Sequence, residues 1–272
     1  GMPTTFGSAH RTRPAGDTDP AARALLDAGA IIPGKSAAAE LGLTIYTEPS
    51  GLPFPDNPLW PGRTPAGSSG GAAVLVARGI LPAAHASDGG GSIRVPAAAC
   101  GVVGFKPSAP RLAAQGFITR TLDDAAFLHR LSPEPGRRRI GVLVQPLFTG
   151  SAVDEVHLRA TAEAAAQLAE AGHDVVDVHP YPSAEETFEA FRTIFTAKLA
   201  GLSGPAEGLV GWLRAHGRAL GRGRLDQANR HADALPQYLA EYWGVDALLT
   251  PMTTTDPPLI GHFASMDPEG NF

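Results

Sequence analysis

Two short clusters of glycine and serine constrain this chain more than any other feature. Residues 67–71 (GSSGG) come directly before an apolar run, and residues 88–96 (DGGGSIRVP) follow another one. Three successive glycines before Ser92 leave backbone N–H groups free of side-chain shielding, and N–H groups that converge on one point can stabilise an oxyanion. A serine hydroxyl needs a base in hydrogen-bond contact before it becomes a good nucleophile. The two clusters therefore predict a site for acyl transfer, with Ser92 at its rim.

Other interpretations of these clusters fit the residues less well. His85 and Asp88 lie on the same strand and turn as Ser92, which leaves little freedom for a local Ser/His/Asp relay, and His85 is expected to be a packed strand residue. A G-x-S-x-G nucleophile elbow requires glycine where Arg94 stands. Residues 62–69 (GRTPAGSS) have serine where a Walker A motif requires lysine, and GGGS lacks the G-x-G-x-x-G frame of a dinucleotide site. The structural alternative is that both clusters are ordinary tight turns without a catalytic role.

Composition excludes several other classes of protein. The 272 residues carry a formal net charge of -5, which offers no broad positive field for nucleic acid, and 43% of them are hydrophobic, enough for a sizeable core. The single cysteine, Cys100, excludes an internal disulfide framework and a cysteine-based zinc site. No apolar stretch approaches the ~20 residues of a membrane span. We therefore expect a cytoplasmic chain that acts on a small molecule and uses no metal, cofactor, membrane or nucleic acid, while a homo-oligomer stays open.

Hydrophobic periodicity predicts an α/β fold. A β-branched run at 140–144, an amphipathic stretch at 153–171 and a second strand at 174–178 form a βαβ unit. Such a unit implies a right-handed crossover and a mainly parallel or mixed central sheet flanked by helices. Gly172 stands where a helix C-cap glycine belongs. The remaining expected elements are a capped helix at 18–29, a buried strand at 30–33, a short helix at 36–42, an extended surface loop at 47–64, a buried helix at 72–78, a buried strand at 81–87 and a connector at 132–136.

Residues 62–108 carry a longer resemblance. The stretch GRTPAGSSGGAAVLVARGILPAAHASDGGGSIRVPAAACGVVGFKPS resembles the signature sequence of the amidase signature family, serine hydrolases that use a Ser, cis-Ser, Lys triad. The resemblance implies the amidase signature fold as a single α/β domain over residues 1–272, with a helical substrate-side region at 184–243. It also implies hydrolysis of amides without a cofactor. Further segments that resemble amidases are residues 1–8, 28–41, the βαβ unit and 245–258.

The resemblance assigns roles to residues of the two clusters. Ser92 matches the nucleophile that forms the acyl-enzyme. Ser68, which lies 24 positions earlier, matches the serine that follows a cis peptide bond and relays the proton. The oxyanion-hole positions are Gly89, Gly90 and Gly91, together with the N–H of Ser92, and the positions that brace the loop are Asp88 and Arg94.

The catalytic lysine of the family has no match here. The resemblance implies that it lies in a Lys-Asp motif upstream of the segment that resembles residues 1–8, whereas Lys35, Lys106 and Lys198 are not followed by aspartate. Lys35 and Lys106 match family positions outside the triad and are expected to be structural or surface residues. In the family, a strand and helices follow the region that resembles 250–258. We therefore expect an amidase-type chain shortened at both ends, with impaired hydrolysis of linear amides.

A second hypothesis belongs to another class of protein. It describes a non-catalytic amidase remnant that binds a small amide or carboxylate, or that packs against another polypeptide supplying a missing strand. The feature that discriminates the two hypotheses is the catalytic lysine, and the test is whether a fluorophosphonate probe forms an adduct on Ser92.

Overall fold

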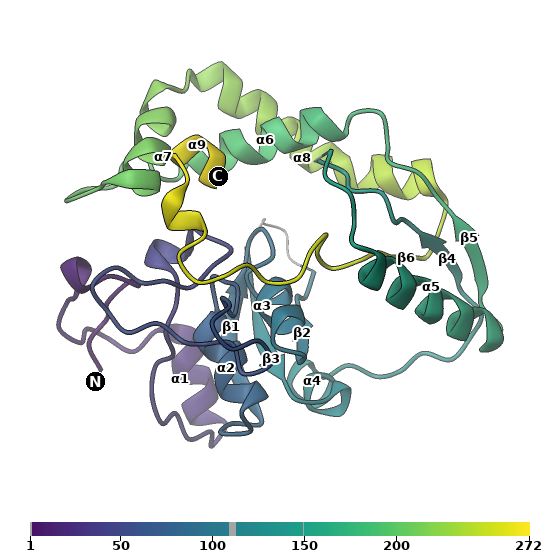
Figure 1. The fold of residues 1–272 in the computed structure, drawn as a ribbon, viewed down its shortest axis with the longest axis horizontal. Coiled ribbons are helices and arrows are strands. Elements are labelled where there is room, and N and C mark those ends of the chain that lie inside the picture. Colours follow the sequence, from purple (N-terminus) through teal and green to yellow (C-terminus); the bar gives the residue numbers. More distant parts are fainter. Residues whose placement is uncertain (1, 109–112, 149) are drawn as a thin grey trace. The chain divides into compact units, whose positions relative to one another are not determined.

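The computed structural model describes residues 2–108, 113–148 and 150–272. The chain forms two compact units, of which unit 1 comprises residues 1–132 and 257–265 and unit 2 comprises residues 133–256 and 266–272. The boundary falls in the predicted connector. Each unit contains a small β-sheet flanked by helices, so the α/β class is confirmed, with two sheets in place of one central sheet (Figure 1). The expectation of one domain over the whole chain stays a prediction.

Unit 1 is built on a three-stranded antiparallel sheet. Its strands are ordered β1 (Ala83–Asp88), β3 (Ala114–Thr119) and β2 (Val103–Phe105), with Asp88 opposite Ala114 and Phe105 opposite Phe117. Side chains of β1 alternate between buried and less buried positions, so the expected fully buried strand is buried on one face only. The helices of this unit are α1 (Pro20–Asp27), α2 (Gly70–Ala77), α3 (Arg94–Ala99) and α4 (Leu122–His129), with short 3-10 turns η1 (Ala9–Arg11), η2 (Glu40–Gly42) and η3 (Phe263–Ser265).

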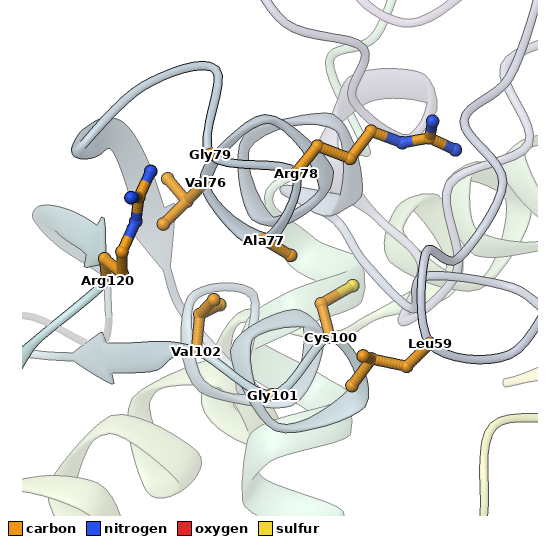
Figure 2. Close-up of a pocket in the computed structure, with 9 residues that line it drawn as sticks. All are labelled: Leu59, Val76, Ala77, Arg78, Gly79, Cys100, Gly101, Val102 and Arg120. Carbon is orange, nitrogen blue, oxygen red and sulfur yellow. The ribbon is translucent and has the colours of Figure 1, made fainter.

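A hollow of about 310 Å³ lies at the C-terminal end of α2 (Figure 2). Its wall comes from the last turn of α2, the turn between α3 and β2, and two side chains from other loops. None of the three serines of the two clusters lines it. The lining residues are Leu59, Val76, Ala77, Arg78, Gly79, Cys100, Gly101, Val102 and Arg120.

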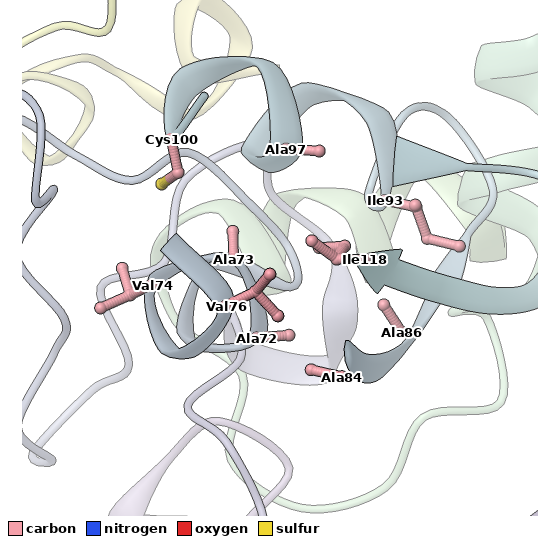
Figure 3. Close-up of a cluster of buried hydrophobic side chains, with 10 residues drawn as sticks. All are labelled: Ala72, Ala73, Val74, Val76, Ala84, Ala86, Ile93, Ala97, Cys100 and Ile118. Carbon is pink, nitrogen blue, oxygen red and sulfur yellow. The ribbon is translucent and has the colours of Figure 1, made fainter. Parts of the chain in front are cut away.

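The core of unit 1 consists largely of small side chains around α2. This helix is buried on nearly all sides, as predicted, and packs against β1, α3 and β3 (Figure 3). An ideal Cβ on Gly71 would lie 2.5 Å from the backbone N and O atoms of Ala37, so only glycine lets the chain at residue 37 approach this closely. The members of the core cluster are Ala72, Ala73, Val74, Val76, Ala84, Ala86, Ile93, Ala97, Cys100 and Ile118.

The first helix begins and ends as predicted, but the strand expected after it is wrong. The Asp19 carboxylate accepts the N–H of Ala21 at 2.9 Å, and Gly29 adopts a φ of +86° after the helix. Residues 30–33 form no strand, and Ile31 is 91% exposed. Residues 30–33 include β-branched side chains, which favour a strand, but no strand of the described residues pairs with this segment.

The helix expected at 36–42 is also wrong, because this backbone is hydrogen-bonded to the first serine cluster. Ala37 O accepts the N–H of Gly71, and Ala39 N–H donates to Ser68 O, both at 3.0 Å. A helix would need those same backbone groups for its own hydrogen bonds. The segment is therefore extended until η2.

The loop at 47–64 contains no helix or strand, as expected, but it is not wholly a surface loop. Thr47, Asn57 and Thr64 are buried. The Asn57 amide donates to Thr64 O at 3.2 Å and to Ala99 O at 2.9 Å, and its oxygen accepts the N–H of Leu59 at 2.9 Å. One asparagine thus ties the loop to the end of α3.

Unit 2 contains the predicted βαβ unit. Strand β4 (Arg139–Val142), helix α5 (Glu155–Glu170) and strand β5 (Asp174–Asp177) follow one another, and β4 and β5 pair in parallel. Gly172 has a φ of +91° directly after Ala171, the C-cap residue of α5, which confirms the glycine expected at the end of this helix. A third strand, β6 (Ala247–Leu249), pairs in parallel with the other edge of β4, giving the order β5-β4-β6.

The region at 184–243 carries three helices, α6 (Ala184–Ala197), α7 (Gly208–Ala219) and α8 (Arg222–Trp243), and α9 (Pro268–Asn271) packs against α7. Three phenylalanines of α6 form an aromatic stripe that continues to Phe272. These rings are half-buried, whereas the opposite face of α6 carries the buried residues Ala190, Thr193 and Thr196. Among the helices of the described residues, none combines the length and the hydropathy needed to cross a bilayer.

Candidate active site

The first serine cluster lies in the loop that leads into α2. The peptide bond between Gly67 and Ser68 is cis, which is the position that the resemblance implies. Ser68 is 4% exposed, and its carbonyl oxygen accepts the N–H of Ala39. The Thr47 hydroxyl donates to Ala66 O at 2.9 Å and accepts the N–H of Gly70 at 3.1 Å. Neutral hydrogen bonds therefore hold the loop on both sides of Ser68.

Thr47 carries no motif, so sequence reasoning missed its role. A threonine in a proline-rich loop gives no signal of its own. Its position is visible only once residues 47 and 66–70 are seen in contact.

The second cluster forms the loop between β1 and α3, and the buried carboxylate of Asp88 organises it. Asp88 is 0% exposed and accepts the N–H of Gly91 at 2.7 Å and of Ile93 at 3.2 Å. Arg94 donates to both carboxylate oxygens, each at 2.9 Å. Burial alone would raise the pKa of Asp88, but the hydrogen bonds and charge of Arg94, with the two backbone N–H groups, outweigh it and lower this pKa to about 2.

The carboxylate of Asp88 divides the N–H groups of the loop into two sets. The N–H of Gly91 is engaged by Asp88, and Gly91 turns the chain with a φ of +125°. No acceptor among the described residues takes the N–H of Gly89, Gly90 or Ser92. The latter three donors are thus available to a ligand. Ser92 is half-buried, so its hydroxyl is not sealed into the core.

A local Ser/His/Asp relay does not form on β1. Neighbouring side chains of a strand point to opposite faces, so His85 and Asp88, three positions apart, lie on opposite faces of the sheet. The His85 ring contacts Phe117 edge-on, with 5.8 Å between centroids, and burial lowers its pKa. His85 is therefore a strand residue on the face of β1 opposite Asp88, and it is exposed rather than packed into the core as expected.

The lysines have separate environments. Lys106 donates from Nζ to Gly89 O at 3.4 Å and lies 3.9 Å from Asp88 Oδ1. Lys35 is exposed and donates to Pro3 O at 3.1 Å and to Thr4 Oγ1 at 2.8 Å. Lys198 caps the end of α6 in unit 2. The described residues contain no group of three or more His, Cys, Asp or Glu side chains able to hold a metal ion.

The family match extends from the sequence clusters to much of the chain. A family model described as Amidase matches residues 1–131. AmiB2 of Mycobacterium tuberculosis (strain ATCC 25618 / H37Rv), which bears an amidase name, is 33% identical over 302 residues, covering 97% of this chain and 64% of AmiB2. The 6-aminohexanoate-cyclic-dimer hydrolase of Paenarthrobacter ureafaciens is 33% identical over 212 residues, covering 64% of this chain and 43% of that enzyme.

Solved structures give the same result. A crystal structure of an amidase has a TM-score of 0.80 and 30% identity, covering 96% of this chain and 66% of the other. A 6-aminohexanoate cyclic dimer hydrolase complexed with substrate has a TM-score of 0.81 and 26% identity, covering 89% of this chain and 61% of the other. The chain thus has the α/β fold of the amidase and of the cyclic dimer hydrolase. Its first 131 residues match the amidase family, as the resemblance implied, and the chain spans 64% of the length of AmiB2.

Proposed function

We propose that this chain carries the acyl-transfer site of an amide hydrolase, with Ser92 as the nucleophile and Ser68 as the proton relay. Ser92 Oγ attacks the amide carbonyl carbon and forms a C–O bond, while the π electrons of the carbonyl move onto its oxygen. The N–H groups of Gly89, Gly90 and Ser92 stabilise that oxyanion. Gly91 contributes the turn of the loop rather than a donor, because its N–H is engaged by Asp88.

Collapse of the tetrahedral intermediate completes the first half of the reaction. The C–N bond breaks, and the leaving amine takes the proton that Ser68 received from Ser92. Water then attacks the acyl ester on Ser92, which releases a carboxylic acid and restores both hydroxyls. One amide and one water give one acid and one amine.

One observation carries this proposal: Asp88 accepts the N–H groups of Gly91 and Ile93, whereas the N–H of Ser92 has no acceptor among the described residues. A loop that served only as a tight turn would satisfy its N–H groups internally, as Asp88 does for Gly91 and Ile93. Leaving the N–H of Ser92 without an acceptor beside a half-buried hydroxyl is the arrangement that an oxyanion hole requires.

Ser68 requires a base, which the resemblance implies is a lysine from a Lys-Asp motif. Lys35 and Lys106 donate to backbone carbonyls, so we assign the base to neither. We expect residues 1–272 alone to turn over amides slowly, because loss of one triad member costs about a thousandfold or more in serine hydrolases.

We propose linear amides as the substrate class, on the strength of the resemblance. One relative is named as a hydrolase of a cyclic dimer, so cyclic diamides are the competing class. Release of amine from a linear alkyl amide and from a cyclic diamide, measured side by side, distinguishes the two. Faster release from the cyclic compound would contradict the linear assignment.

A fluorophosphonate probe tests the catalytic assignment directly, because it phosphonylates an activated serine without requiring turnover. We expect mass spectrometry to find the adduct on Ser92 and to find none in Ser92→Ala. The circular dichroism of both proteins should be the same. A folded chain that takes no label on Ser92 would contradict the proposal and favour a non-catalytic amide-binding remnant.

A further inference from the structure

Lys106 contacts the glycine loop, and its Nζ lies 3.9 Å from Asp88 Oδ1, the carboxylate oxygen that holds the N–H of Gly91. It follows β2 directly, and the next residue is Pro107, which restricts the backbone of Lys106 to extended conformations. Its side chain is 21% exposed, so the ammonium group is partly withdrawn from water. Its hydrogen bond to Gly89 O, at 3.4 Å, crosses from the sheet to the loop.

A hydrogen bond to Gly89 O also determines where the next N–H points. In a trans peptide the C=O and the following N–H point in opposite directions within one plane. The described residues have a cis bond only between Gly67 and Ser68. Holding Gly89 O towards Lys106 therefore turns the N–H of Gly90 away from Lys106, towards the open side of the loop.

Opposite charges thus anchor two neighbouring peptide groups. Lys106 donates a hydrogen bond to the carbonyl oxygen of Gly89, and Asp88 accepts the N–H of Gly91 at 2.7 Å. Asp88 and Lys106 are also within 3.9 Å of each other, so each keeps the other in place. Gly90, which has no side chain and is exposed, is therefore held through the peptide groups on both of its sides.

We infer that Lys106 is a positioning residue for the oxyanion hole, and that its ammonium group aims the N–H of Gly90 at the developing oxyanion. The inference rests on the proposed function of Ser92. It assigns to Lys106 more than the structural or surface role that its sequence position suggested. Lys106 acts through the loop and does not itself touch the substrate.

Three variants test this role. Lys106→Met keeps most of the side-chain volume and removes the donor, and Lys106→Arg keeps the charge and a donor. Lys35→Met is the matched control, since Lys35 also donates to backbone oxygens of unit 1 but lies away from the glycine loop. The measurements are the rate of fluorophosphonate labelling at Ser92 and hydrogen exchange in peptides that cover residues 88–94.

We expect Lys106→Met to lower the maximal labelling rate about tenfold, part of the loss seen when one oxyanion donor is removed, with the concentration for half-maximal rate unchanged. Exchange in 88–94 should rise. Lys106→Arg should restore both measurements, and Lys35→Met should match the wild type. If Lys106 were only structural, Lys106→Met would lower the stability of the fold without lowering the maximal labelling rate at an unchanged half-saturating probe concentration.

The outcomes separate this inference from the proposed function. Labelling and exchange equal to the wild type in Lys106→Met, or equal losses in Lys106→Met and Lys35→Met, would overturn the inference. If Lys106→Met does not fold, Lys106→Gln against Lys106→Arg gives the same comparison. A wild type that takes no label on Ser92 would overturn the proposed function and the oxyanion role with it, while the exchange data still decide whether Lys106 anchors the loop.

Discussion

The two serine-bearing loops of unit 1 pack against one core but are held by different forces. The loop with Ser68 depends on neutral hydrogen bonds from Thr47, Ala37 and Ala39. The loop with Ser92 depends on a fully buried carboxylate paired with Arg94. In the proposed function, a relay hydroxyl needs only a fixed position, whereas donors for an oxyanion must also stay open. The buried carboxylate of Asp88 holds the N–H groups of Gly91 and Ile93 and leaves that of Ser92 without an acceptor among the described residues. The comparison teaches that loops of the same residue types, glycine and serine, can be fixed by neutral hydrogen bonds in one case and by a buried charge in the other.

The largest expected effect concerns the relay. With the base of Ser68 supplied, Ser68→Ala should slow fluorophosphonate labelling of Ser92 by about a thousandfold or more, because Ser92 loses its proton acceptor; in residues 1–272 alone the further loss should be smaller, because triad members act as a unit. Ser69→Ala is the matched control, since Ser69 is also buried but its side chain makes no capping hydrogen bond. Equal labelling rates in Ser68→Ala and Ser69→Ala would contradict the relay role of Ser68.

The second effect concerns the charged brace. Asp88→Asn should lower the free energy of unfolding by about 3 kcal/mol, because buried N–H groups and Arg94 lose a charged acceptor. Urea denaturation measures this difference. Glu189→Gln, which removes an ion pair that is exposed, should change it by no more than about 0.5 kcal/mol. A similar small change in Asp88→Asn would show that the charge does not hold the loop.

The third effect is pH dependence, which only the Ser92 loop should show. The pKa of Asp88 is lowered to about 2 in the folded chain, below its ordinary value of 3.8. A depressed carboxyl pKa stabilises the fold above the unfolded-state pKa, and this contribution, about 2 kcal/mol, is lost as pH falls from about 4 to about 2.

Unfolding free energies of the wild type and Asp88→Asn, measured across that range, check this. The difference between the two proteins should be constant near neutral pH and should shrink by about 2 kcal/mol in acid. A difference that does not change with pH would mean that the carboxylate is not the titrating group.

The smallest effect concerns the neutral brace. Thr47→Val should cost about 1 to 2 kcal/mol, because Gly70 loses its acceptor and Ala66 its donor in a buried site. Thr47→Ser should keep most of the stability. The cost should be the same at neutral and at acid pH, and a cost that depends on pH would remove the contrast between the loops.

The elements that could be predicted from sequence are those in which local pattern and packing agree. The β-branched run, the amphipathic stretch and Gly172 each indicated one step of the βαβ unit, and α2 was evident because AAVLVA is apolar on every side. Ser68, Ser92 and the three glycines stood out since small residues in such a cluster affect the backbone directly.

What could not be predicted depends on contacts between distant residues. The segment at 36–39 has helical composition, yet its backbone pairs with residues 68–71, which lie some thirty positions away. Whether Gly91 donates to a substrate or to Asp88 is likewise invisible in GGGS, because it depends on where a carboxylate three residues earlier points. Lys106 becomes part of the same site only through the antiparallel sheet.

Cys100 offers a way to observe unit 1 without any assay of catalysis. It is 1% exposed at the end of α3, and burial raises its thiol pKa to about 12, so the closed structure presents almost no thiolate. A thiol reagent can modify it only when the packing of α2 against α3 opens. Because the chain has one cysteine, the rate of that modification measures the opening of unit 1 only and does not report motions of unit 2.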